Sequence, residues 1–352
     1  MMYFRRSTTV KYFIAAFVGA ALYCEWFIYL IQPLYWQRLE CKTHDQSCTK
    51  ILFIADPQIQ GDLAVPPPLS YLFNWDSDRY VKTTFSMVMN QFKPDVLVYL
   101  GDLMDEGSIS TLPQFHSYVK RLSHIFNIDY PVIQVWIPGD NDIGGENEPI
   151  KNDKVEEFEK VFQQPTVITF RNISFYKVNA ITHTYPKKPE SGDNNLRIIV
   201  SHYPVTSKVA FAQKVNNEIR PNIYFCAHDH ESKYVEQKKD LTQRSVQRML
   251  TGDFMLHVQF DKDSLYEIFV PTCSYRMGTD SIGFGAAILE NNNQEMKYTV
   301  LWSPKRFPYL FFYAGILLLL VVYCFIYCSA RLAHNRLNSV TISDKVPLLE
   351  RI

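Results

Sequence analysis

Residues 51–56 read ILFIAD, and four later runs repeat the same pattern: VLVYLGD (96–102), VIQVWIPGD (132–140), RIIVSH (197–202) and IYFCAH (223–228). Each run is apolar, is rich in β-branched and aromatic residues, and stops at a carboxylate or an imidazole. Runs of this kind are typical of strands that are buried on both faces. The polar residues then mark where the chain leaves the core, at Asp56, Asp102, Asp140, His202 and His228.

Helical periodicity separates these predicted strands. Apolar residues recur at helical spacing in 80–92, 112–126 and 155–162. Alternating strands and helices predict an α/β fold, and in such sheets ligands bind at the carboxyl ends of the strands. We therefore expect the five polar residues to converge. Beyond Phe254, four alternating runs predict a second sheet that closes the domain: LHVQF, YEIFV, AAILE and KYTVLW.

The expected cluster has the composition of a binuclear metal site. His230 lies two positions after His228, and Gln58 lies two positions after Asp56, so on extended backbone each pair faces the same way. A single Asp or His at a strand end is usually a cap or a solvated residue, but several gathered together bind divalent cations. Two such ions about 3.5–4 Å apart promote the hydrolysis of phosphate esters. Asp102 is the predicted bridge, because each of its oxygens can bind one ion.

These spacings resemble the calcineurin-like metallophosphoesterase superfamily over roughly 51–230. The matching stretches are Asp56-Pro57-Gln58, Gly101-Asp102-Leu103-Met104-Asp105, Gly139-Asp140-Asn141-Asp142, His202 and Ala227-His228-Asp229-His230. The resemblance implies a two-metal phosphoesterase with an α/β metallophosphoesterase fold, a layered β-sandwich flanked by helices. It implies one ion held by Asp56, Gln58, Asp102 and His230, and another held by Asp102, Asp140, His202 and His228.

Four positions depart from the superfamily pattern. Gln58 replaces a His and can still ligate through its amide oxygen, and Ala227 replaces a Gly at little steric cost. Asp140 replaces an Asn, which adds hard oxygen to the ligand set and favours manganese or magnesium over zinc, so we expect two Mn²⁺ ions. Asn141 replaces the catalytic His that helps the leaving group depart. It can donate a hydrogen bond to phosphate but cannot deliver a proton, a contribution worth about 10²–10⁴ in rate.

Two segments are long and apolar enough to cross a bilayer. The first, 12–31, follows three basic residues and contains a single charge, Glu25. We interpret it as an uncleaved signal anchor rather than a cleaved signal peptide, because no clear cleavage site follows it. The second, 308–330, contains no charged residue.

The basic N-terminal flank predicts how the chain is threaded through the membrane. The balanced charge, 36 basic against 36 acidic residues, gives no reason to expect a nucleic-acid partner. The predicted parts are a cytosolic tail (1–11), a signal anchor (12–31), a luminal metallophosphoesterase domain (32–306), a transmembrane helix (308–330) and a second cytosolic tail (331–352).

Weaker signals agree with a luminal middle segment. Asn172 begins an Asn-Ile-Ser glycosylation acceptor. Cys41 and Cys48 lie close together after the first span, where the lumen would permit a disulfide. In the tail, residues 344–349 (DKVPLL) have the acidic residue and paired leucines of a trafficking signal. The alternative is a disordered end that no adaptor protein recognises.

Five further residues have open roles. Asp105 and Asp142 are either catalytic or loop anchors that cap backbone amides. Arg276 either meets the phosphate or is a surface arginine, and we leave it out of the predicted site. Two histidines outside the motifs, His183 and His257, can compensate for the missing leaving-group His.

Longer stretches, which extend beyond the ligand residues, narrow the resemblance to one branch of the superfamily. GDLMDEGS, PGDNDIGGE with KVEEFEKVF, and VPTCSYRMG look like the membrane-anchored metallophosphoesterases that remodel glycosylphosphatidylinositol (GPI) anchors. That resemblance implies manganese-dependent removal of ethanolamine-phosphate from a mannose of the anchor glycan, which promotes exit of GPI-anchored proteins from the endoplasmic reticulum (ER). It implies ER exit sites, the ER–Golgi intermediate compartment and the Golgi membrane as the location, with cargo receptors and trafficking adaptors as further partners.

Two other functions stay open. A domain without the leaving-group His can act as a sorting protein that binds phosphorylated glycan through its metals without hydrolysis. A phosphomonoesterase acting on soluble substrates fits the site equally well, but it gives the two membrane spans no purpose.

Overall fold

The computed structural model describes residues 6–42, 47–187, 194–249, 252, 254–260 and 263–343. The chain forms two compact units, one of residues 28–305 and one of residues 1–27 together with 306–352. The predicted trafficking signal at 344–349 lies outside the described residues.

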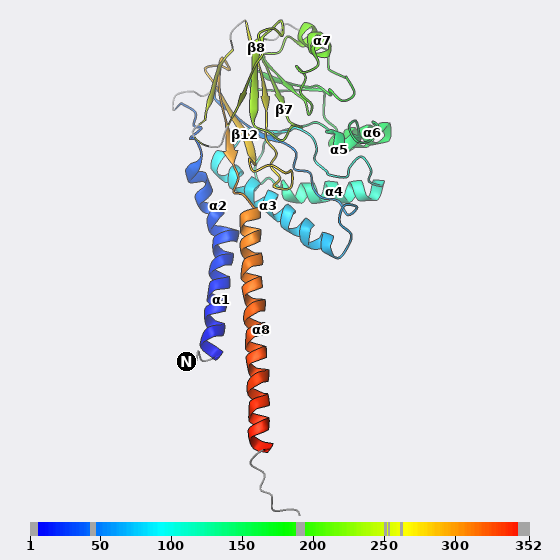
Figure 1. Cartoon of the computed structure of the whole chain (residues 1–352). Helices are drawn as coiled ribbons and strands as arrows, with labels where there is room; N and C mark the ends of the chain where they lie inside the picture. The colour runs from blue at the N-terminus through cyan, green and yellow to red at the C-terminus, as the bar shows by residue number, and fades with distance from the viewer. Residues whose placement is uncertain are drawn as a thin grey trace, which may run out of the picture. The chain divides into compact units, whose positions relative to one another are not determined.

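The 28–305 unit is built on two β-sheets, labelled in part in Figure 1. In spatial order the six-stranded sheet contains β10 (Leu256–Gln259), β13 (Glu295–Trp302), β12 (Gly283–Glu290), β1 (Thr49–Ile54), β2 (Val96–Tyr99) and β3 (Ile133–Trp136). The seven-stranded sheet contains β4 (Val167–Phe170), β5 (Ile173–Lys177), β6 (Leu196–Val200), β7 (Ile223–Cys226), β11 (Ser264–Phe269), β8 (Lys233–Lys238) and β9 (Ser245–Arg248).

The two sheets bury one shared apolar core. Side chains from β1, β2 and β3 pack against side chains from β5, β6 and β7 in a single buried cluster. At its centre the rings of Phe53 and Phe225 stack with 3.9 Å between their centroids. Since strands of both sheets supply this core, the α/β sandwich predicted from the sequence is confirmed.

Helices cover the outer faces of both sheets. The rings of Phe85 in α3 (Leu69–Phe92) and Tyr99 in β2 both pack on Phe126, directly after α4 (Leu112–Ile125). On the other side, α7 (Val209–Ile219) packs on the seven-stranded sheet. The remaining helices of this unit are α2 (Ile28–Ile31), the 3₁₀ helix η2 (Gln32–Tyr35), α5 (Asp140–Ile143) and α6 (Asn152–Phe162).

Two expectations from the sequence need correction. The runs after Phe254 do not form a separate second sheet: β10, β12 and β13 extend the sheet of β1–β3, and β11 pairs in parallel with β7. The alternation of apolar and polar residues indicates which face of a strand is buried. It does not indicate which other strand pairs with that strand. The helix expected from 80 begins at Leu69. Its first turns expose apolar residues such as Leu72 and bury polar ones such as Ser70, so they do not show the pattern of a helix with a buried apolar face.

The second unit holds the rest of the predicted membrane anchors. It contains α1 (Arg6–Leu22), a π-helical turn η1 (Tyr23–Phe27) and α8 (Phe307–Ser343). By length and composition, Lys11–Tyr35 and Phe307–Ala333 can each cross a membrane. Glu25, the charge inside the first apolar segment, accepts a hydrogen bond of 2.9 Å from Arg306. The threading and the compartment of the chain stay predictions.

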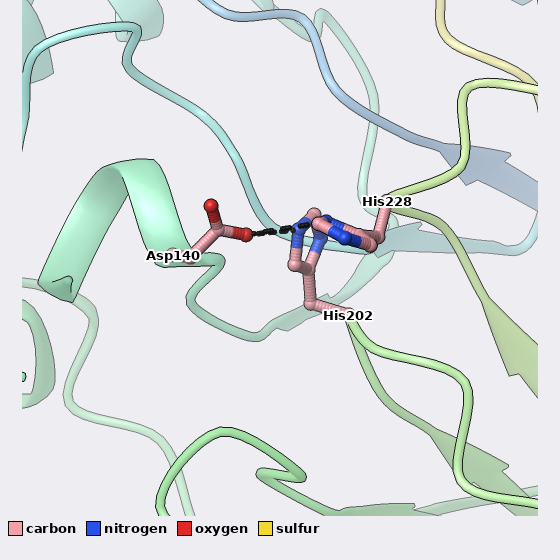
Figure 2. Close-up of side chains that lie close together, drawn as sticks. All are labelled: Asp140, His202 and His228. Atoms are coloured by element: carbon pink, nitrogen blue, oxygen red, sulfur yellow. Dashed lines mark hydrogen bonds and ion pairs between the residues drawn. The ribbon is translucent and has the colours of Figure 1, made fainter. Parts of the chain in front are cut away.

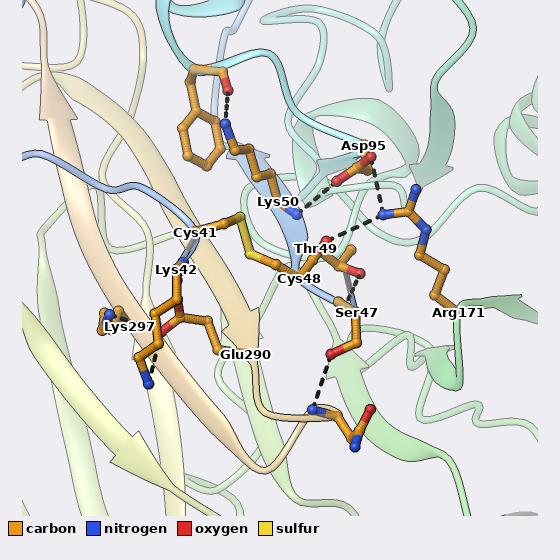
Figure 3. Close-up of a disulfide and its surroundings, with 12 residues drawn as sticks. Cys41, Lys42, Ser47, Cys48, Thr49, Lys50, Asp95, Arg171, Glu290 and Lys297 are labelled. Atoms are coloured by element: carbon orange, nitrogen blue, oxygen red, sulfur yellow. Dashed lines mark hydrogen bonds and ion pairs between the residues drawn. A yellow bond between two sulfur atoms is a disulfide. The ribbon is translucent and has the colours of Figure 1, made fainter. Parts of the chain in front are cut away.

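A disulfide joins Cys41 to Cys48, just before β1 (Figure 3). Glu290, at the end of β12, accepts a hydrogen bond from the backbone N–H of Lys42 within this loop and pairs with Lys297 at 2.8 Å. Burial alone would raise the pKa of the Glu290 carboxyl, but these bonds outweigh it and lower the pKa. Cys41 and Lys42 are therefore held beside the start of the first ligand strand, covalently by the disulfide and electrostatically by Glu290.

Candidate metal centre

The carboxyl ends of five parallel-paired strands meet at one edge of the sandwich. In the six-stranded sheet β1, β2 and β3 run parallel, and in the seven-stranded sheet β6 and β7 do so. The predicted site residues follow these strands directly and fall into two groups of side chains whose ligand atoms lie within 4.8 Å of one another. The first group is Asp56, Asp102 and His230, and the second is Asp140, His202 and His228. The expected convergence therefore occurs, with the residues drawn from two sheets.

The first group contains a buried carboxylate that the protein leaves without a hydrogen bond. Asp56 is 0% exposed, and among the described residues no donor makes a hydrogen bond to either of its oxygens. Burial, with the nearby charge of Asp102, raises the pKa of Asp56 well above its ordinary value, and His202 opposes the shift. The backbone N–H of His228 lies near without hydrogen-bond geometry. His202 Nδ1 lies 3.6 Å from Asp56 Oδ1, so the imidazole offsets part of this charge. A buried carboxylate without hydrogen bonds is still costly, and a bound cation would satisfy it.

Gln58 belongs beside this first group. Its amide nitrogen donates to Asp102 Oδ2 at 2.9 Å and lies 3.4 Å from His230 Nε2. To serve as a ligand, the amide has to turn about its last bond so that its oxygen takes the place of the nitrogen. Gln58 therefore lies where a metal ligand is expected, and its role as a ligand stays a prediction.

The second group is connected by its own hydrogen bonds (Figure 2). His202 Nε2 lies 3.0 Å from Asp140 Oδ1, and His228 Nδ1 lies 3.4 Å from the same oxygen. On the other side of its ring, His202 Nδ1 donates to the backbone carbonyl of Leu100 at 2.8 Å. This bond to the carbonyl of Leu100 fixes the orientation of the ring and leaves Nε2 as the atom that can bind a metal.

Asp102 lies between the two groups. Its Oδ1 is 3.4 Å from His202 Nε2 and accepts a hydrogen bond from the backbone N–H of Asn141 at 2.9 Å. Its Oδ2 accepts from the side-chain amides of Asn141 and Gln58, both at 2.9 Å. This is the position that a bridging carboxylate needs, with Asn141 held against it.

The charges of the cluster shift the pKa values of its members. Burial alone would lower the pKa of His202, but Asp102, Asp140 and Asp56 outweigh it and raise the pKa to about 10. Burial would raise the pKa of Asp140, yet hydrogen bonds from His202 and His228 lower it. For His230, burial and the two other imidazoles lower the pKa. Without a metal, the proton on His202 supplies part of the positive charge that the carboxylates require.

The backbone at the site is strained. Asp56, Gln58, Asp102, His228 and His230 have φ values of 46°, 40°, 49°, 68° and 57°. A non-glycine residue in this region costs on the order of 1–3 kcal/mol, and such residues cluster at functional sites. Gly139 permits the close approach of two ligand loops, because a Cβ there would lie 2.1 Å from Asp102 Oδ1. The fold thus holds these side chains in one place against local conformational preference.

The donor set fits a pair of divalent cations. Carboxylate oxygens, imidazole nitrogens and one amide are ligands for manganese, iron, zinc or magnesium. Asp56, Gln58, Asp102 and His230 would hold one ion, and Asp102, Asp140, His202 and His228 the other. The unpaired oxygens of Asp56 are the structural observation that supports this fit.

Three residues with open roles join loops in the structure. Asp142 is 0% exposed, and its carboxylate accepts hydrogen bonds from the backbone N–H groups of Leu103, Met104 and Gly139. Arg276 donates to Asp105 Oδ2 at 2.8 Å and to the backbone carbonyl of Gln58 at 2.9 Å. Asp105, Asp142 and Arg276 therefore hold the ligand loops together.

Other residues at the centre carried no signal in the sequence. The ring of Tyr203 lies 4.1 Å from that of His228. Glu267 in β11, 0% exposed, accepts from the backbone N–H of Val205 at 2.7 Å and of Thr206 at 3.0 Å, which fixes the loop after His202. Glu267 lies about sixty positions from these partners, so no local pattern identifies it.

The two histidines considered as substitutes for the leaving-group His lie in other surroundings. His257 is exposed on β10, three strands away from β1 in the sheet order. His183 packs against Phe211 of α7, with 5.1 Å between ring centroids. Neither belongs to the two groups of potential ligands found among the described residues.

Comparison with known proteins places this geometry in a family context. A family model described as calcineurin-like phosphoesterase matches residues 49–232. A protein named Metallophosphoesterase 1 from Danio rerio is 30% identical over 172 residues, which cover 48% of this chain and 44% of the relative. Its namesake from Pongo abelii is 27% identical over 185 residues, covering 50% and 45%. The chain thus spans less than half the length of the curated relatives it matches.

Solved structures give a looser likeness. A metallophosphoesterase from Sphaerobacter thermophilus superposes over 71% of this chain and 87% of its own, with 15% sequence identity and a TM-score of 0.37. At that score the superposition adds nothing to the assignment.

Proposed function

This chain belongs to the calcineurin-like phosphoesterase family, and we propose that it is a metal-dependent phosphoesterase that hydrolyses a phosphodiester carried by a membrane-anchored glycan. Within that class, the substrate is an ethanolamine-phosphate branch on a mannose of the GPI anchor, and the metal is manganese. The relatives named Metallophosphoesterase 1 support the reaction class, since they match half of the chain.

One observation carries the hydrolytic proposal. Two groups of potential ligands share an edge of the sandwich, and Asp56 within them is buried with no hydrogen bond from any described residue. Two bound divalent cations supply the charge that stabilises a phosphoryl group during transfer. The protein contributes fixed geometry, since its ligand loops are joined by Asp142 and by the pair of Arg276 with Asp105.

Asn141 sets the limit of the chemistry. Its backbone and side-chain nitrogens both donate to Asp102, so the residue orients the carboxylate that lies between the two groups. An amide cannot give a proton to a departing alkoxide, which favours substrates with a good leaving group. The ring of Tyr203 lies 4.1 Å from that of His228, at a tilt of 54°, so this side chain can order the substrate beside the second group of ligands.

A basic pocket adjoins the second group of ligands. It has a volume of about 370 Å³, and the basic residues of its lining are Lys208, Lys233 and Arg244, beside His228. Asp229 is the one carboxylate in the lining, and it pairs with Lys233 at 2.6 Å. Cationic side chains beside a metal cluster suit an anionic phosphodiester. The pocket supports binding of the phosphate-bearing part of the substrate on this side of the centre.

The location follows from the same proposal. The 28–305 unit lies in the lumen of the early secretory pathway, where the disulfide of Cys41 with Cys48 would form. Two candidate spans confine it to the membrane layer in which GPI-anchored proteins, its substrates, are found. Asn172 is exposed at the turn between β4 and β5, as a glycosylation acceptor requires.

The second candidate function is binding without hydrolysis. Asn141 favours it, because the residue lacks a transferable proton. In that case the metals recognise phosphorylated glycan cargo, and the chain sorts such cargo together with receptors or trafficking adaptors.

Assay of the purified full chain with Mn²⁺ tests the proposal. We expect turnover of bis(4-nitrophenyl) phosphate to exceed that of 4-nitrophenyl phosphate, and a GPI-anchored protein to lose one ethanolamine-phosphate by mass spectrometry. The Asn141→His variant should raise the rate on poor leaving groups by about 10²-fold, since it restores a general acid.

The outcomes separate the candidates. Uptake of metal with no turnover of either ester, in the wild type and in Asn141→His, supports the sorting role. A preference for the monoester rules out anchor remodelling and keeps the phosphoesterase assignment.

A further inference from the structure

The first turns of α3 and the loop before it expose an unusual amount of apolar surface. Between Asp62 and Asp76 the sequence LAVPPPLSYLFNW contains no charged residue. Leu69, Tyr71, Leu72 and Trp75 are 59%, 67%, 60% and 59% exposed, and Leu63, the three prolines and Phe73 are exposed as well. We call residues 63–75 the apolar ridge. Single exposed apolar residues are ordinary, but a contiguous set marks an interaction surface.

Basic side chains flank the ridge on one side. A pocket of about 490 Å³ is lined by Trp75, Arg79, Lys82, Lys120 and His124, with Asp78 as the single carboxylate among its lining residues. Arg79 lies over the Trp75 ring, 5.2 Å from its centroid. Exposed aliphatic and aromatic side chains next to a basic pocket match the two layers of a membrane surface, the acyl boundary and the phosphate layer.

Within the 28–305 unit, the end of the first candidate span and the residues just before the second one lie beside α3. The end of the first span lies in α2 and η2, which contact α3, and the rings of Tyr29 and Tyr80 lie edge to face at 6.5 Å. Tyr80 donates to the backbone carbonyl of Pro304, three residues before α8 begins, at 2.7 Å. Trp36 donates to the carbonyl of Trp302 at 2.8 Å. The chain thus leaves one span and approaches the other beside the same turn of α3.

The distance from that turn to the ridge is short. Leu72 precedes Tyr80 by eight residues, which is about 12 Å along a helix. We propose that the apolar ridge inserts into the interfacial layer of the bilayer, with the flanking basic pocket at the lipid phosphates. The partner is the lipid surface itself, so the unit has a third point of attachment besides the two spans.

The ridge is directly connected to the metal centre. It follows Gln58 by only a few residues, and Arg121 donates to the carbonyl of Gln60 while it pairs with Asp78 of α3. Tyr275, beside Arg276, donates to Asp76 at the C-terminal end of the ridge. Insertion of the ridge therefore fixes the height of the ligand loops above the membrane, where a phosphodiester on a lipid-linked glycan is presented.

Fluorescence of the full chain in nanodiscs tests this inference without any need for turnover. The signal of Trp75 is the difference between wild type and Trp75→Phe. We expect that component to lose roughly half or more of its intensity when the lipids carry brominated acyl chains, and to be shielded from aqueous iodide. The matched control is Val209→Trp in the Trp75→Phe background, because Val209 is also exposed but lies on α7 over the other sheet.

Each outcome bears on the proposal. Quenching of the Trp75 component by bromolipid, with quenching of the Val209→Trp component by iodide alone, supports it. A Trp75 component that iodide quenches and bromolipid does not would overturn it and leave the ridge to a protein partner. A chain that fails to co-elute with the disc overturns the spans and the inference together. None of these results depends on the phosphodiesterase proposal.

Discussion

Asp56 and Glu267 are two carboxylates with identical burial and opposite surroundings. Both are 0% exposed, one directly after β1 of the six-stranded sheet and one within β11 of the seven-stranded sheet. Glu267 accepts hydrogen bonds from two backbone N–H groups and one hydroxyl, those of Val205 and Thr206. Asp56 accepts none from the described part of the chain.

The difference shows what separates a ligand from a structural acid. Burial raises the pKa of both groups, so neither burial nor a perturbed pKa identifies the functional one. The protein satisfies Glu267 with its own donors and thereby fixes a loop. It leaves Asp56 unsatisfied in a strained backbone conformation, φ 46°, beside two more potential ligands. A buried carboxylate that accepts no hydrogen bond, rather than burial alone, indicates a site at which an ion binds.

Asp102→Asn should have the largest effect. Asp102 lies between the two groups, so Asn at this position removes the negative charge that both ions share and replaces one of the two bridging oxygens by an amide nitrogen, which cannot bind a cation. We expect both metals to be absent by elemental analysis and the phosphodiesterase rate to fall by about a thousandfold or more.

Glu267→Gln is the matched control, since it also removes one buried negative charge. It should retain both metals. If Asp102→Asn keeps either ion at full occupancy, or if Glu267→Gln loses both, the proposed distinction between ligand and structural acid is wrong.

Stability in the absence of metal should change in opposite directions at the two carboxylates. In EDTA, Asp56→Asn removes a buried charge that accepts no hydrogen bond from the described residues and that His202, 3.6 Å away, offsets only in part, so it should raise the free energy of unfolding by about 1–3 kcal/mol. Glu267→Gln replaces an acceptor of three hydrogen bonds by an amide, and should lower it by about 1–3 kcal/mol. Thermal unfolding resolves both, at about 2–4 °C per kcal/mol for a domain of this size.

Added Mn²⁺ completes the experiment. Saturation at about 100 times Kd should stabilise the wild type by about 2.7 kcal/mol per site, and Asp56→Asn should lose that gain for one ion. Destabilisation by Asp56→Asn in EDTA would mean that the carboxylate has a structural partner after all.

Arg276→Met tests the support behind the first ligand group. Arg276 holds the carbonyl of Gln58 and the carboxylate of Asp105, so its removal should weaken the ion of that group by about tenfold. The ion held by the second group should be unaffected. Calorimetric titration with Mn²⁺ distinguishes two sites whose affinities change separately.

Arg171→Met is the control for that variant. Arg171 also pairs with an aspartate, Asp95 at 3.4 Å, and donates to a backbone carbonyl, that of Cys48, near the disulfide (Figure 3). It should change neither affinity. Equal losses in the two variants would indicate a general effect of removing an arginine from a loop.

The sequence predicts the site better than it predicts the sheets. Asp56, Asp102, Asp140, His202 and His228 could be named because each ends a local apolar run, a property of a few adjacent residues. The assignment of those runs to two sheets could not be predicted, since strand pairing depends on contacts between distant segments. The strands β4, β5, β8 and β9 were missed because none of their runs ends at a carboxylate or an imidazole, and β9 is also exposed along its whole length.

Residues that hold the ligand loops in place are harder to predict from the sequence than the ligands themselves. Arg276 was noticed as a possible phosphate contact, and the structure gives it a place behind Gln58 instead. Glu267 carried no signal, because its partners are about sixty positions away. Exposed apolar residues at the start of α3 obscured the helical period there, which is why the predicted helix began at Tyr80 instead of Leu69.

The smallest expected effect is a pH dependence at Glu267. Burial raises the pKa of this carboxyl above its ordinary value of 4.5 and outweighs the hydrogen bonds of Thr206 and Val205. As the pH falls, the folded chain therefore takes up this proton before the unfolded chain does, and folding is favoured increasingly until the pH reaches the ordinary value. Gln cannot titrate, so the destabilisation caused by Glu267→Gln should be smallest near neutrality and should grow on acidification.

Thermal unfolding of wild type and Glu267→Gln in EDTA between pH 7 and pH 5 measures this difference, because titration of all other groups is common to both proteins. A difference that shrinks as the pH falls would mean that the ionised form of Glu267 is the one that Val205 and Thr206 stabilise. Glu267 would then resemble Glu290, whose pKa is lowered by Lys297 and Lys42. The number of hydrogen bonds that each carboxylate accepts would no longer explain by itself why Asp56 differs from Glu267.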